Sequence, residues 1–281
     1  MQPVTGTAVP PDLARDLLDA FAARDAEVVR VELDPPKTYL WARSATEELF
    51  AWQSAEPGSE AIVDYEVAVR AAVGTEGSLR APPILARGRN WRLEPAVGEA
   101  PLGERDVVEA VAAAATRLAE LELPAAPRGL GRERMNSKLL RRVRLLRAPL
   151  PLSDLVRARA LLAASPLPTT TSHGDFHRRH ILFSGGVLWV VDWEFAGRRP
   201  AGYDLMTLWA DLEDEGDRHL LFELCVEMVG AECRRELLKL RYALLVRIIG
   251  DMLVADDDAH DPTAVPGLLA LLPGVRADAG D

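Results

Sequence analysis

The sequence predicts an α+β protein of two lobes, a small antiparallel-sheet lobe followed by a larger helical lobe. In the first 95 residues, hydrophobic and polar residues alternate in several short runs, which is typical of half-buried strands. Beyond residue 101, hydrophobic residues recur every three or four positions, as they do along one face of a helix. A short stretch with prolines and a glycine, 95–101, separates the two patterns. We therefore expect one lobe over residues 1–95 and the other over 96–281.

The composition limits what kind of protein this can be. The chain has 281 residues, of which 48% are hydrophobic and 27% are charged, and its net charge is −10. An acidic chain is a poor partner for nucleic acid, whose phosphates attract basic surfaces. The two cysteines, Cys225 and Cys233, form no CxxC motif, so we expect a reducing compartment and no disulfide framework.

Signals for secretion or membrane insertion are weak in this sequence. The N-terminus does not have the charged start and apolar core of a signal peptide. The longest apolar stretch, 243–255, is interrupted by Arg247 and Asp251 and is too short to span a bilayer. We therefore expect a cytoplasmic protein with neither a membrane nor a nucleic acid as its partner. The sequence does not indicate an oligomeric state.

The first lobe is expected to contain a meander of strands and two helices. Its predicted elements are, in order, a helix over 11–26, strands over 29–33, 39–42 and 49–53, a helix over 59–74, and strands over 83–86 and 91–94. In the second helix, Ser59 is expected as the N-cap and Gly74 as the terminator. Glu66 falls on the apolar face of this helix, and a carboxylate that faces a core needs a partner or a function.

The second lobe is expected to be helical around one short hairpin. Its predicted elements are helices over 104–121, 132–146 and 153–163, strands over 181–183 and 187–191, and a mainly helical region beyond residue 200. The chain contains no GxxxxGK[ST], GxGxxG or GxSxG motif. These absences argue against a P-loop ATPase, a dinucleotide-dependent enzyme and an α/β-hydrolase.

A glycine dipeptide predicts the hairpin of this lobe. Gly185-Gly186 stands between two apolar runs, which is a strong signal for a two-residue turn. With this turn, Ile181 pairs with Val190, and Asp192 lies at the open end of the hairpin near His180.

Three side chains that can do chemistry converge at that open end. The loop that carries Asp175 leads into it, so we expect Asp175, His180 and Asp192 in one small volume. These residue types suit phosphoryl transfer, because one aspartate can accept the proton of an attacking hydroxyl and another can hold the Mg²⁺ that neutralises the phosphates of ATP. Such catalysis consists mainly of positioning and charge neutralisation, so few side chains are needed.

The same segment resembles the catalytic loop of the aminoglycoside phosphotransferase and choline kinase families. That loop has the pattern H-G-D-x-x-x-x-N and is followed by a hairpin that ends in D-[FW]-[DE], and residues 173–175 and 192–194 match it. The resemblance implies a protein-kinase-like, two-lobed α+β fold. It also implies that Asp175 is the catalytic base, that Asp192 is a metal ligand, and that His173 supports the loop.

One departure from the pattern lies in the loop itself. The loop asparagine, a metal ligand in the resembled families, is replaced by His180. Neutral imidazole is a poor ligand for Mg²⁺ and a better one for Mn²⁺ or Zn²⁺, so His180 is either a metal ligand or a structural histidine. Lipopolysaccharide sugar kinases of the same fold also resemble this loop with a histidine there. Glu194 is an alternative oxygen ligand, and 202–205 resembles the structural turn that follows in the family.

The second departure lies in the first lobe. The resembled families carry on their third strand a lysine that grips the ATP phosphates and pairs with a helix glutamate. Glu66 matches that glutamate, but the strand position falls on Gln53, so Lys37 or Arg43 would have to supply the missing charge. Main-chain groups of the connection between the lobes bind the adenine in this fold. The resemblance therefore implies four nucleotide-binding residues, Gln53, Glu66, Glu94 and Ala96.

The predicted function is ATP-dependent phosphorylation of a hydroxyl group on a small molecule, such as an aminoglycoside, a sugar or a choline-like compound. The predicted cofactors are ATP, or another nucleoside triphosphate, and Mg²⁺ or Mn²⁺. The replacements at Gln53 and His180 support an alternative, a catalytically weak or inactive kinase-like protein that binds a nucleotide or a metabolite. A zinc hydrolase that uses the histidines at 173, 177 and 180 is a third interpretation.

Two acidic runs lie in the second lobe, over 211–217 and 256–258. Runs of like charge usually form a solvated surface. The functional alternative is attraction for a cationic, amine-bearing substrate.

Overall fold

The computed structural model describes residues 13–34, 36–98, 104–127, 149–184, 187–254 and 264–280. The chain divides into two compact units, of which the first comprises 1–101, 122–128 and 180–194 and the second comprises 102–121, 129–179 and 195–281. The first contains an antiparallel sheet and the second is mainly helical, so the predicted two-lobed α+β fold is confirmed. The hairpin after residue 180 belongs to the sheet-containing unit.

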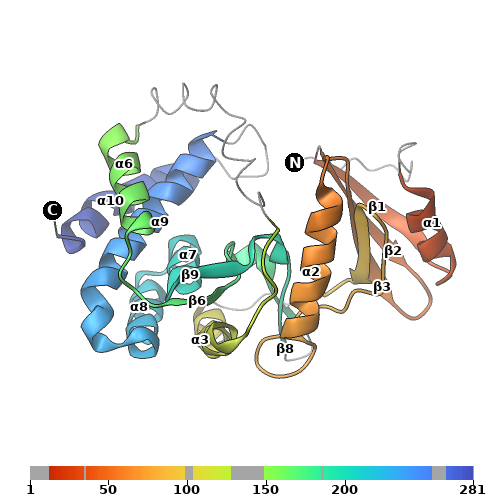
Figure 1. Ribbon diagram of the computed structural model, residues 1–281, viewed down its shortest axis with the longest axis horizontal. Coiled ribbons are helices and arrows are strands. Elements are labelled where there is room, and N and C mark those ends of the chain that lie inside the picture. The colour runs from red at the N-terminus through yellow and green to blue at the C-terminus, as the bar shows by residue number, and fades with distance from the viewer. Residues whose placement is uncertain are drawn as a thin grey trace. The chain divides into compact units, whose positions relative to one another are not determined.

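The first unit is built on a five-stranded antiparallel sheet (Figure 1). Its strand order is β1 (Glu27–Asp34), β2 (Lys37–Arg43), β3 (Glu48–Ser54), β5 (Trp91–Pro95) and β4 (Ala86–Arg87). The predicted meander is confirmed by the pairing of β2 with both β1 and β3. The strand predicted over 83–86 begins only at Ala86, although the N–H of Leu85 already donates to the carbonyl of Leu93 at 2.8 Å; Pro83 has no N–H to donate.

One face of this sheet is covered by α1 (Arg15–Ala22), which packs on the buried side chains of Ala51 and Leu93. The helix is shorter than the predicted 11–26 and ends before Asp25, whose φ is 49°. Side chains alternate between the two faces along a strand. Trp52 and Arg92, the neighbours of Ala51 and Leu93 in sequence, therefore lie on the opposite face of the sheet.

The second helix of this unit is α2 (Ser59–Val73). Its N-cap is Gly58, with φ of 85°, and not Ser59 as predicted. Ser59 is the first helical residue, and its hydroxyl donates to the carbonyl of Glu56 at 2.8 Å. Gly74 ends the helix as predicted, with φ of 79° and its N–H donated to the carbonyl of Arg70 at 2.8 Å. On the predicted apolar face, Val69, Val73 and Glu66 are buried, whereas Ile62 is only half-buried.

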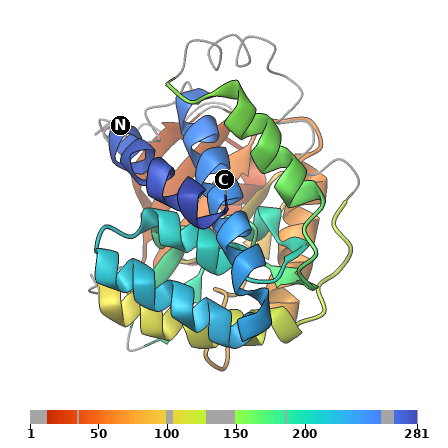
Figure 2. The same ribbon diagram turned by 90° about the vertical axis from the view of Figure 1, so that its left-hand side faces the viewer.

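The second unit is a set of helices in which α9 contacts α6, α7 and α10, while α3 contacts α7 and α8 (Figure 2). The bounds are α3 (Glu104–Glu120), α6 (Leu152–Ala163), α7 (Tyr203–Asp211), α8 (Glu215–Val229), α9 (Arg234–Val254) and α10 (Ala264–Asp278). The middle of α9 is fully buried, as expected for a central helix. The predicted helix over 132–146, the turn at 185–186 and the acidic run 256–258 lie outside the described residues.

Two short sheets are formed by strands that precede and follow the H-G-D loop in the sequence. The hairpin of β7 (Ile181–Ser184) and β8 (Val187–Val190) has the predicted register, with Ile181 opposite Val190. Within the first unit, the hairpin is joined to the segment before β4 by the Val190 N–H, which donates to the carbonyl of Arg80 at 2.8 Å. The second sheet pairs β6 (Thr169–Ser172) with β9 (Gly197–Pro200), and the sequence pattern did not predict it.

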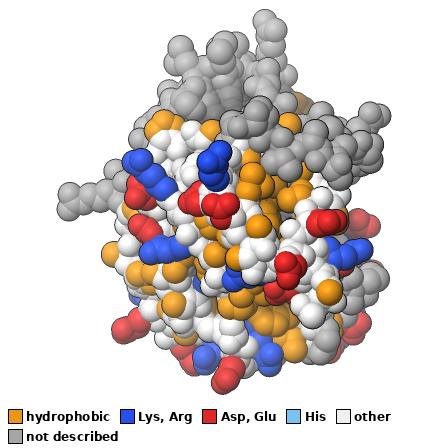
Figure 3. Space-filling view, turned by 90° about the vertical axis from the view of Figure 1, so that its right-hand side faces the viewer, with side chains coloured by type: hydrophobic (Ala, Val, Ile, Leu, Met, Phe, Trp, Pro, Cys, Tyr) orange, Lys and Arg blue, Asp and Glu red, His pale blue; other side chains and the backbone are white. Residues whose placement is uncertain are grey.

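The surface of the first unit mixes apolar and charged side chains. On the side of the molecule where β1 and α1 lie in Figure 1, apolar side chains gather between acidic and basic ones (Figure 3). Val29 and Leu33 of β1 are the exposed large hydrophobic residues of this strand. Among the described helices, none is both long enough and apolar enough to cross a membrane.

Candidate active site

The H-G-D loop in the helical unit is held by one buried carboxylate. Asp204, in the first turn of α7, accepts hydrogen bonds from the Ser172 hydroxyl at 2.7 Å and from the main-chain N–H groups of His173 at 2.7 Å and Gly174 at 3.0 Å. Two of these donors are main-chain groups just before Asp175, so Asp204 fixes the backbone that presents this residue. This geometry gives a physical role to the segment 202–205.

The structure gives a physical reason for each of the first two residues of the H-G-D motif. His173 is fully buried, its Nδ1 accepts the main-chain N–H of Asp175 at 3.4 Å, and its ring meets Phe176 edge-on at 5.7 Å. Gly174 has φ of 86°, and a Cβ there would clash with the carbonyl oxygen of Phe195. Glycine is required because a side chain would be both strained and blocked at this position.

Asp175 is part of a row of three side chains in the same unit. Its Oδ1 lies 3.3 Å from Nε2 of His177, and Nδ1 of His177 lies 3.1 Å from Oδ2 of Asp211 at the end of α7. The main-chain N–H of Arg178 also donates to Asp211, at 2.9 Å. Arg179 is farther away, with Nη2 3.9 Å from Oδ2 of Asp175.

These contacts shift the titration of the histidine and its partner. Burial alone would lower the pKa of His177, but its hydrogen bonds to Asp175 and Asp211 and the charges of both carboxylates raise that pKa to about 9. Burial opposes ionisation of Asp211, yet the contacts with His177 and the Arg178 N–H lower its pKa below the ordinary value. At neutral pH this raised pKa keeps the ring of His177 cationic beside the two carboxyl groups.

In the sheet-containing unit, Asp192 and His180 face each other at the open end of the β7–β8 hairpin. Nε2 of His180 is 3.6 Å from Oδ2 of Asp192, and the carbonyl of His180 accepts the Val191 N–H at 3.0 Å. Asp192 has φ of 62°, one of two described non-glycine residues with positive φ. Strained backbone of this kind persists where the surrounding structure enforces it, commonly at functional sites.

The donor atoms of this pair fit a divalent cation. A carboxylate and an imidazole nitrogen form a ligand set that suits Mn²⁺, and the carboxylate alone suits Mg²⁺. Glu194, the alternative oxygen ligand, is engaged elsewhere in the same unit, because its Oε2 lies 3.0 Å from Nζ of Lys37. Asp192 and His180 are therefore the better candidates for holding a cation among these three residues.

The middle residue of the D-W-E motif joins it to helix α2. Trp193 is fully buried, and its main-chain N–H donates to Oε1 of Glu66 at 3.0 Å. Its indole N–H donates to the carbonyl of Val190 at 2.8 Å. Glu66 thus fixes the backbone immediately after Asp192.

Glu66 belongs to a buried network of two arginines and two glutamates. Its Oε2 accepts from Nη1 of Arg92 at 2.6 Å, and Arg70 lies 3.7 Å from its Oε1. Glu94 accepts from Nε of Arg92 at 3.2 Å and also from Arg70. All four side chains are almost completely buried. The predicted partner of the buried Glu66 is therefore an arginine of β5 and not a residue of β3.

The charge of Arg92 is strongly favoured in this setting. Burial alone would lower the pKa of Arg92, but the carboxylates of Glu66, Glu94 and Asp192 raise it above its ordinary value. The guanidinium lies 4.8 Å from the ring centre of Trp52, and Nζ of Lys37 lies 5.2 Å from the same ring. Two cations thus flank Trp52 on one face of the sheet.

Gln53 lies on the other face. It pairs across the sheet with Trp91, which belongs to the core under α1, and its Oε1 accepts the main-chain N–H of Ala14 at 2.8 Å. Arg43 pairs with Glu48, and both side chains are more than half exposed. Of the two cations considered for the missing lysine, Lys37 is therefore the one that approaches the D-W-E motif.

The two residues predicted to contact the adenine, Glu94 and Ala96, lie at the end of β5 and are bonded to other residues of the first unit. The side chain of Glu94 is used in the arginine network, so its main-chain groups are the ones to consider for a nucleotide. The N–H of Ala96 donates to the carbonyl of Glu48 at 2.8 Å. That N–H already has a partner, which leaves the carbonyl of Ala96 as the group to consider.

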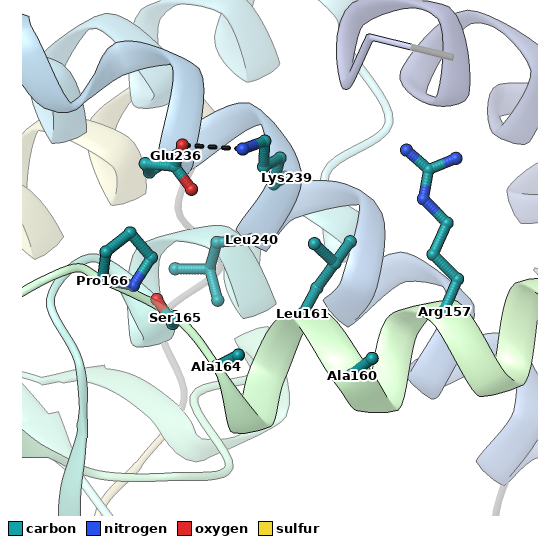
Figure 4. Close-up of a pocket in the computed structure, with 9 residues that line it drawn as sticks. All are labelled: Arg157, Ala160, Leu161, Ala164, Ser165, Pro166, Glu236, Lys239 and Leu240. Atoms are coloured by element: carbon teal, nitrogen blue, oxygen red, sulfur yellow. Dashed lines mark hydrogen bonds and ion pairs between the residues drawn. The ribbon is translucent and has the colours of Figure 1, made fainter.

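A pocket of about 430 Å³ lies between α6 and α9 in the helical unit (Figure 4). An ion pair of Lys239 and Glu236, 2.7 Å apart, lies on one of its sides. Its lining residues are Arg157, Ala160, Leu161, Ala164, Ser165, Pro166, Glu236, Lys239 and Leu240. None of the predicted site residues lines it, so it is separate from the H-G-D loop.

Comparison with known proteins decides the family. A family model described as "Phosphotransferase enzyme family" matches residues 13–226. The chain belongs to this family. The match includes both the H-G-D loop and the D-W-E motif, and it confirms the resemblance inferred from those motifs. A search of curated proteins returned no match.

Solved structures show that this phosphotransferase-family chain has the protein-kinase-like fold. The macrolide 2'-phosphotransferase MphH from Brachybacterium faecium has a TM-score of 0.59 at 15% identity, covering 91% of this chain and 98% of that one. A choline/ethanolamine kinase family protein from Mesorhizobium loti has a TM-score of 0.59 at 16% identity, covering 92% and 90%. The ternary complex of APH(2")-IIa with streptomycin and ATP has a TM-score of 0.61 at 12% identity, covering 94% and 97%. At these identities, the likeness concerns the fold.

Several contacts of this family member were not anticipated from its sequence. They are the pairings of His177 with Asp211, of Lys37 with Glu194 and of Arg92 with Glu66. The two residues of each pair are far apart in the sequence, so no local spacing of residues indicates that they meet. A weak signal existed for Arg92, because Arg92 and Glu94 alternate with Trp91 and Leu93 and must lie together on the face opposite to those two hydrophobic side chains.

Proposed function

We propose that this protein transfers the terminal phosphoryl group of ATP, or of another nucleoside triphosphate, to a hydroxyl of a small molecule such as an aminoglycoside, a sugar or a choline-like compound. The observation that carries the proposal is Asp192, held with a left-handed backbone at the end of β8 with the His180 ring 3.6 Å away. Together with a rigid H-G-D loop, this arrangement supplies the few groups that phosphoryl transfer needs.

The proposed roles of the chain's own groups follow from their chemistry. Asp175 orients the hydroxyl of the acceptor and takes its proton as the oxygen attacks the phosphorus. Asp192 and His180 are the residues that would hold a divalent cation, Mg²⁺ or Mn²⁺. When bound, such a cation would neutralise the charge of the phosphate oxygens.

The proposed nucleotide site uses the cations of the sheet. Lys37 and Arg92, which flank Trp52, take the place of the strand lysine of the resembled families, and Glu66 orients Arg92. Gln53 loses its proposed place beside the phosphates, because its amide lies on the face covered by α1. Glu94 and Ala96 are retained as main-chain contacts for the base. In this proposal, residues 1–95 form the nucleotide-binding lobe and 96–281 carry the base and the acceptor site.

The alternative, a weak or inactive nucleotide-binding protein, was motivated by Gln53 and His180. The buried cations found beside the D-W-E motif favour the active enzyme, because they restore positive charge without Gln53. A cytoplasmic location is also proposed, on the ground that both cysteines are free thiols.

The test is a transfer assay against a panel of hydroxylated acceptors. The protein is incubated with ATP or GTP, with Mg²⁺ or Mn²⁺, and with aminoglycosides, sugars and amino alcohols, and products are identified by mass spectrometry. We expect one acceptor class to gain the mass of a phosphoryl group. Absence of transfer to every class with both nucleotides and both metals would contradict the proposal and favour the inactive alternative.

A further inference from the structure

The strongest unassigned feature is the row formed by Asp175, His177 and Asp211. Each ring nitrogen of His177 faces a carboxylate oxygen, at 3.3 Å on the side of Asp175 and at 3.1 Å on the side of Asp211. A neutral imidazole has one N–H and one acceptor nitrogen, so it can donate to only one of them. The doubly protonated ring donates to both, and only this form satisfies both contacts.

The surroundings of the ring support its charged form. The side chain of His177 is 16% exposed, so solvent screens the three charges only partly. The charged or polar groups that face the row include the main-chain N–H of Arg178, on Asp211, and the guanidinium of Arg179, 3.9 Å from Asp175. The two carboxylates outweigh the effect of burial and raise the pKa of His177 to about 9.

We propose that His177 is a positioning residue, kept in its charged form by Asp211, that fixes the orientation of the Asp175 carboxylate and favours its ionised state. This proposal rests on the proposed function of Asp175 as the catalytic base. The hydrogen bond to Oδ1 restricts rotation of the carboxylate, and a neighbouring cation stabilises the ionised form that accepts a proton.

The proposal gives Asp211 a role that its sequence context did not suggest. Asp211 begins an acidic run for which a solvated surface or attraction of an amine were the two interpretations. Its carboxylate instead accepts from both His177 and the Arg178 N–H at the end of α7. Asp211 therefore ties the helix to the loop and to the base within one unit. Glu213 of the same run is exposed and serves as the matched control.

The first test is an NMR titration of the His177 ring, which needs no acceptor. In the wild-type protein we expect the ring to remain protonated at neutral pH and to titrate near pH 9. In Asp211→Asn the midpoint should fall by about one pH unit or more, whereas Glu213→Gln should leave it unchanged. A wild-type ring that titrates near its ordinary value of about 6.5, or a midpoint insensitive to Asp211→Asn, would overturn the proposal.

The second test is the pH profile of kcat/KM on any acceptor found. Loss of the charged ring should move the acidic limb of the profile to higher pH by about one unit in His177→Gln, but not in Glu213→Gln, and Asp211→Asn should move it less, because its ring is still protonated at the pH of that limb. A uniform loss of activity with an unmoved acidic limb would mean that His177 has a structural role alone. Because the titration is independent of turnover, failure of this proposal and failure of the proposed function are distinguishable.

Discussion

Replacing Asp175 by asparagine is expected to reduce phosphoryl transfer by about 10²- to 10⁴-fold, the range that general base catalysis contributes. The amide has nearly the same shape as the carboxylate, and its oxygen can still accept from His177 at the position now 3.3 Å away. It cannot accept a proton from the acceptor hydroxyl. The change is measured as kcat on the acceptor identified by the transfer assay.

Two controls separate a chemical effect from a structural one. The loop is held by Asp204 and by main-chain groups that Asp175→Asn does not alter, so the midpoint of thermal unfolding should change little. The rise of that midpoint on adding ATP and metal should also be retained. Undiminished turnover in a correctly folded Asp175→Asn protein would remove Asp175 from the mechanism.

The second large effect is expected from Glu66→Gln, which should lower the free energy of unfolding by about 3 to 5 kcal/mol. Glu66 is fully buried and lies 2.6 Å from Arg92 and 3.7 Å from Arg70. Without its charge, two buried guanidinium groups share the single carboxylate of Glu94. An uncompensated buried charge accounts for most of the expected cost. Chemical denaturation measures the change.

A matched control is available on the same helix. Glu60 of α2 forms an ion pair with Arg89 at 2.9 Å, and both side chains are more than half exposed. Glu60→Gln should therefore change the stability by less than about 0.5 kcal/mol. Equal effects of the two substitutions would show that the Glu66 network does not stabilise the first unit in the way proposed here.

Local sequence patterns were sufficient to predict the elements whose structure depends mainly on neighbouring residues. The β7–β8 register followed from a glycine dipeptide between two apolar runs, and the pairing of Ile181 with Val190 is confirmed. Gly74 ends α2 as predicted because a left-handed residue suits glycine. The capping prediction for Ser59 was wrong because Gly58, which also takes a left-handed conformation, already begins the helix.

Non-local contacts explain what the sequence could not show. The pairing of β6 with β9 joins short polar strands with no hydrophobic alternation. The face of the sheet on which Gln53 lies depends on the register of β3, since a shift of one residue exchanges the two faces of a strand. Arg92 meets Glu66 only because β5 is the neighbour of β3 in the sheet, and His177 meets Asp211 only because α7 ends beside the loop.

The most direct measurement is thermal unfolding with ATP and Mg²⁺ or Mn²⁺, in the wild-type protein and in three variants. Ligand that binds the folded state raises the midpoint, by about 5 °C or more when ATP is roughly 100-fold above its Kd. Asp192→Asn removes the metal-binding charge while tolerating the left-handed backbone, and it should abolish the metal-dependent part of the rise. Lys37→Met should reduce the rise, whereas Arg43→Met, on the same strand, should retain it. A metal-dependent rise with this pattern is the predicted result, and the absence of any rise, or an equal rise in wild type and Asp192→Asn, would contradict the account.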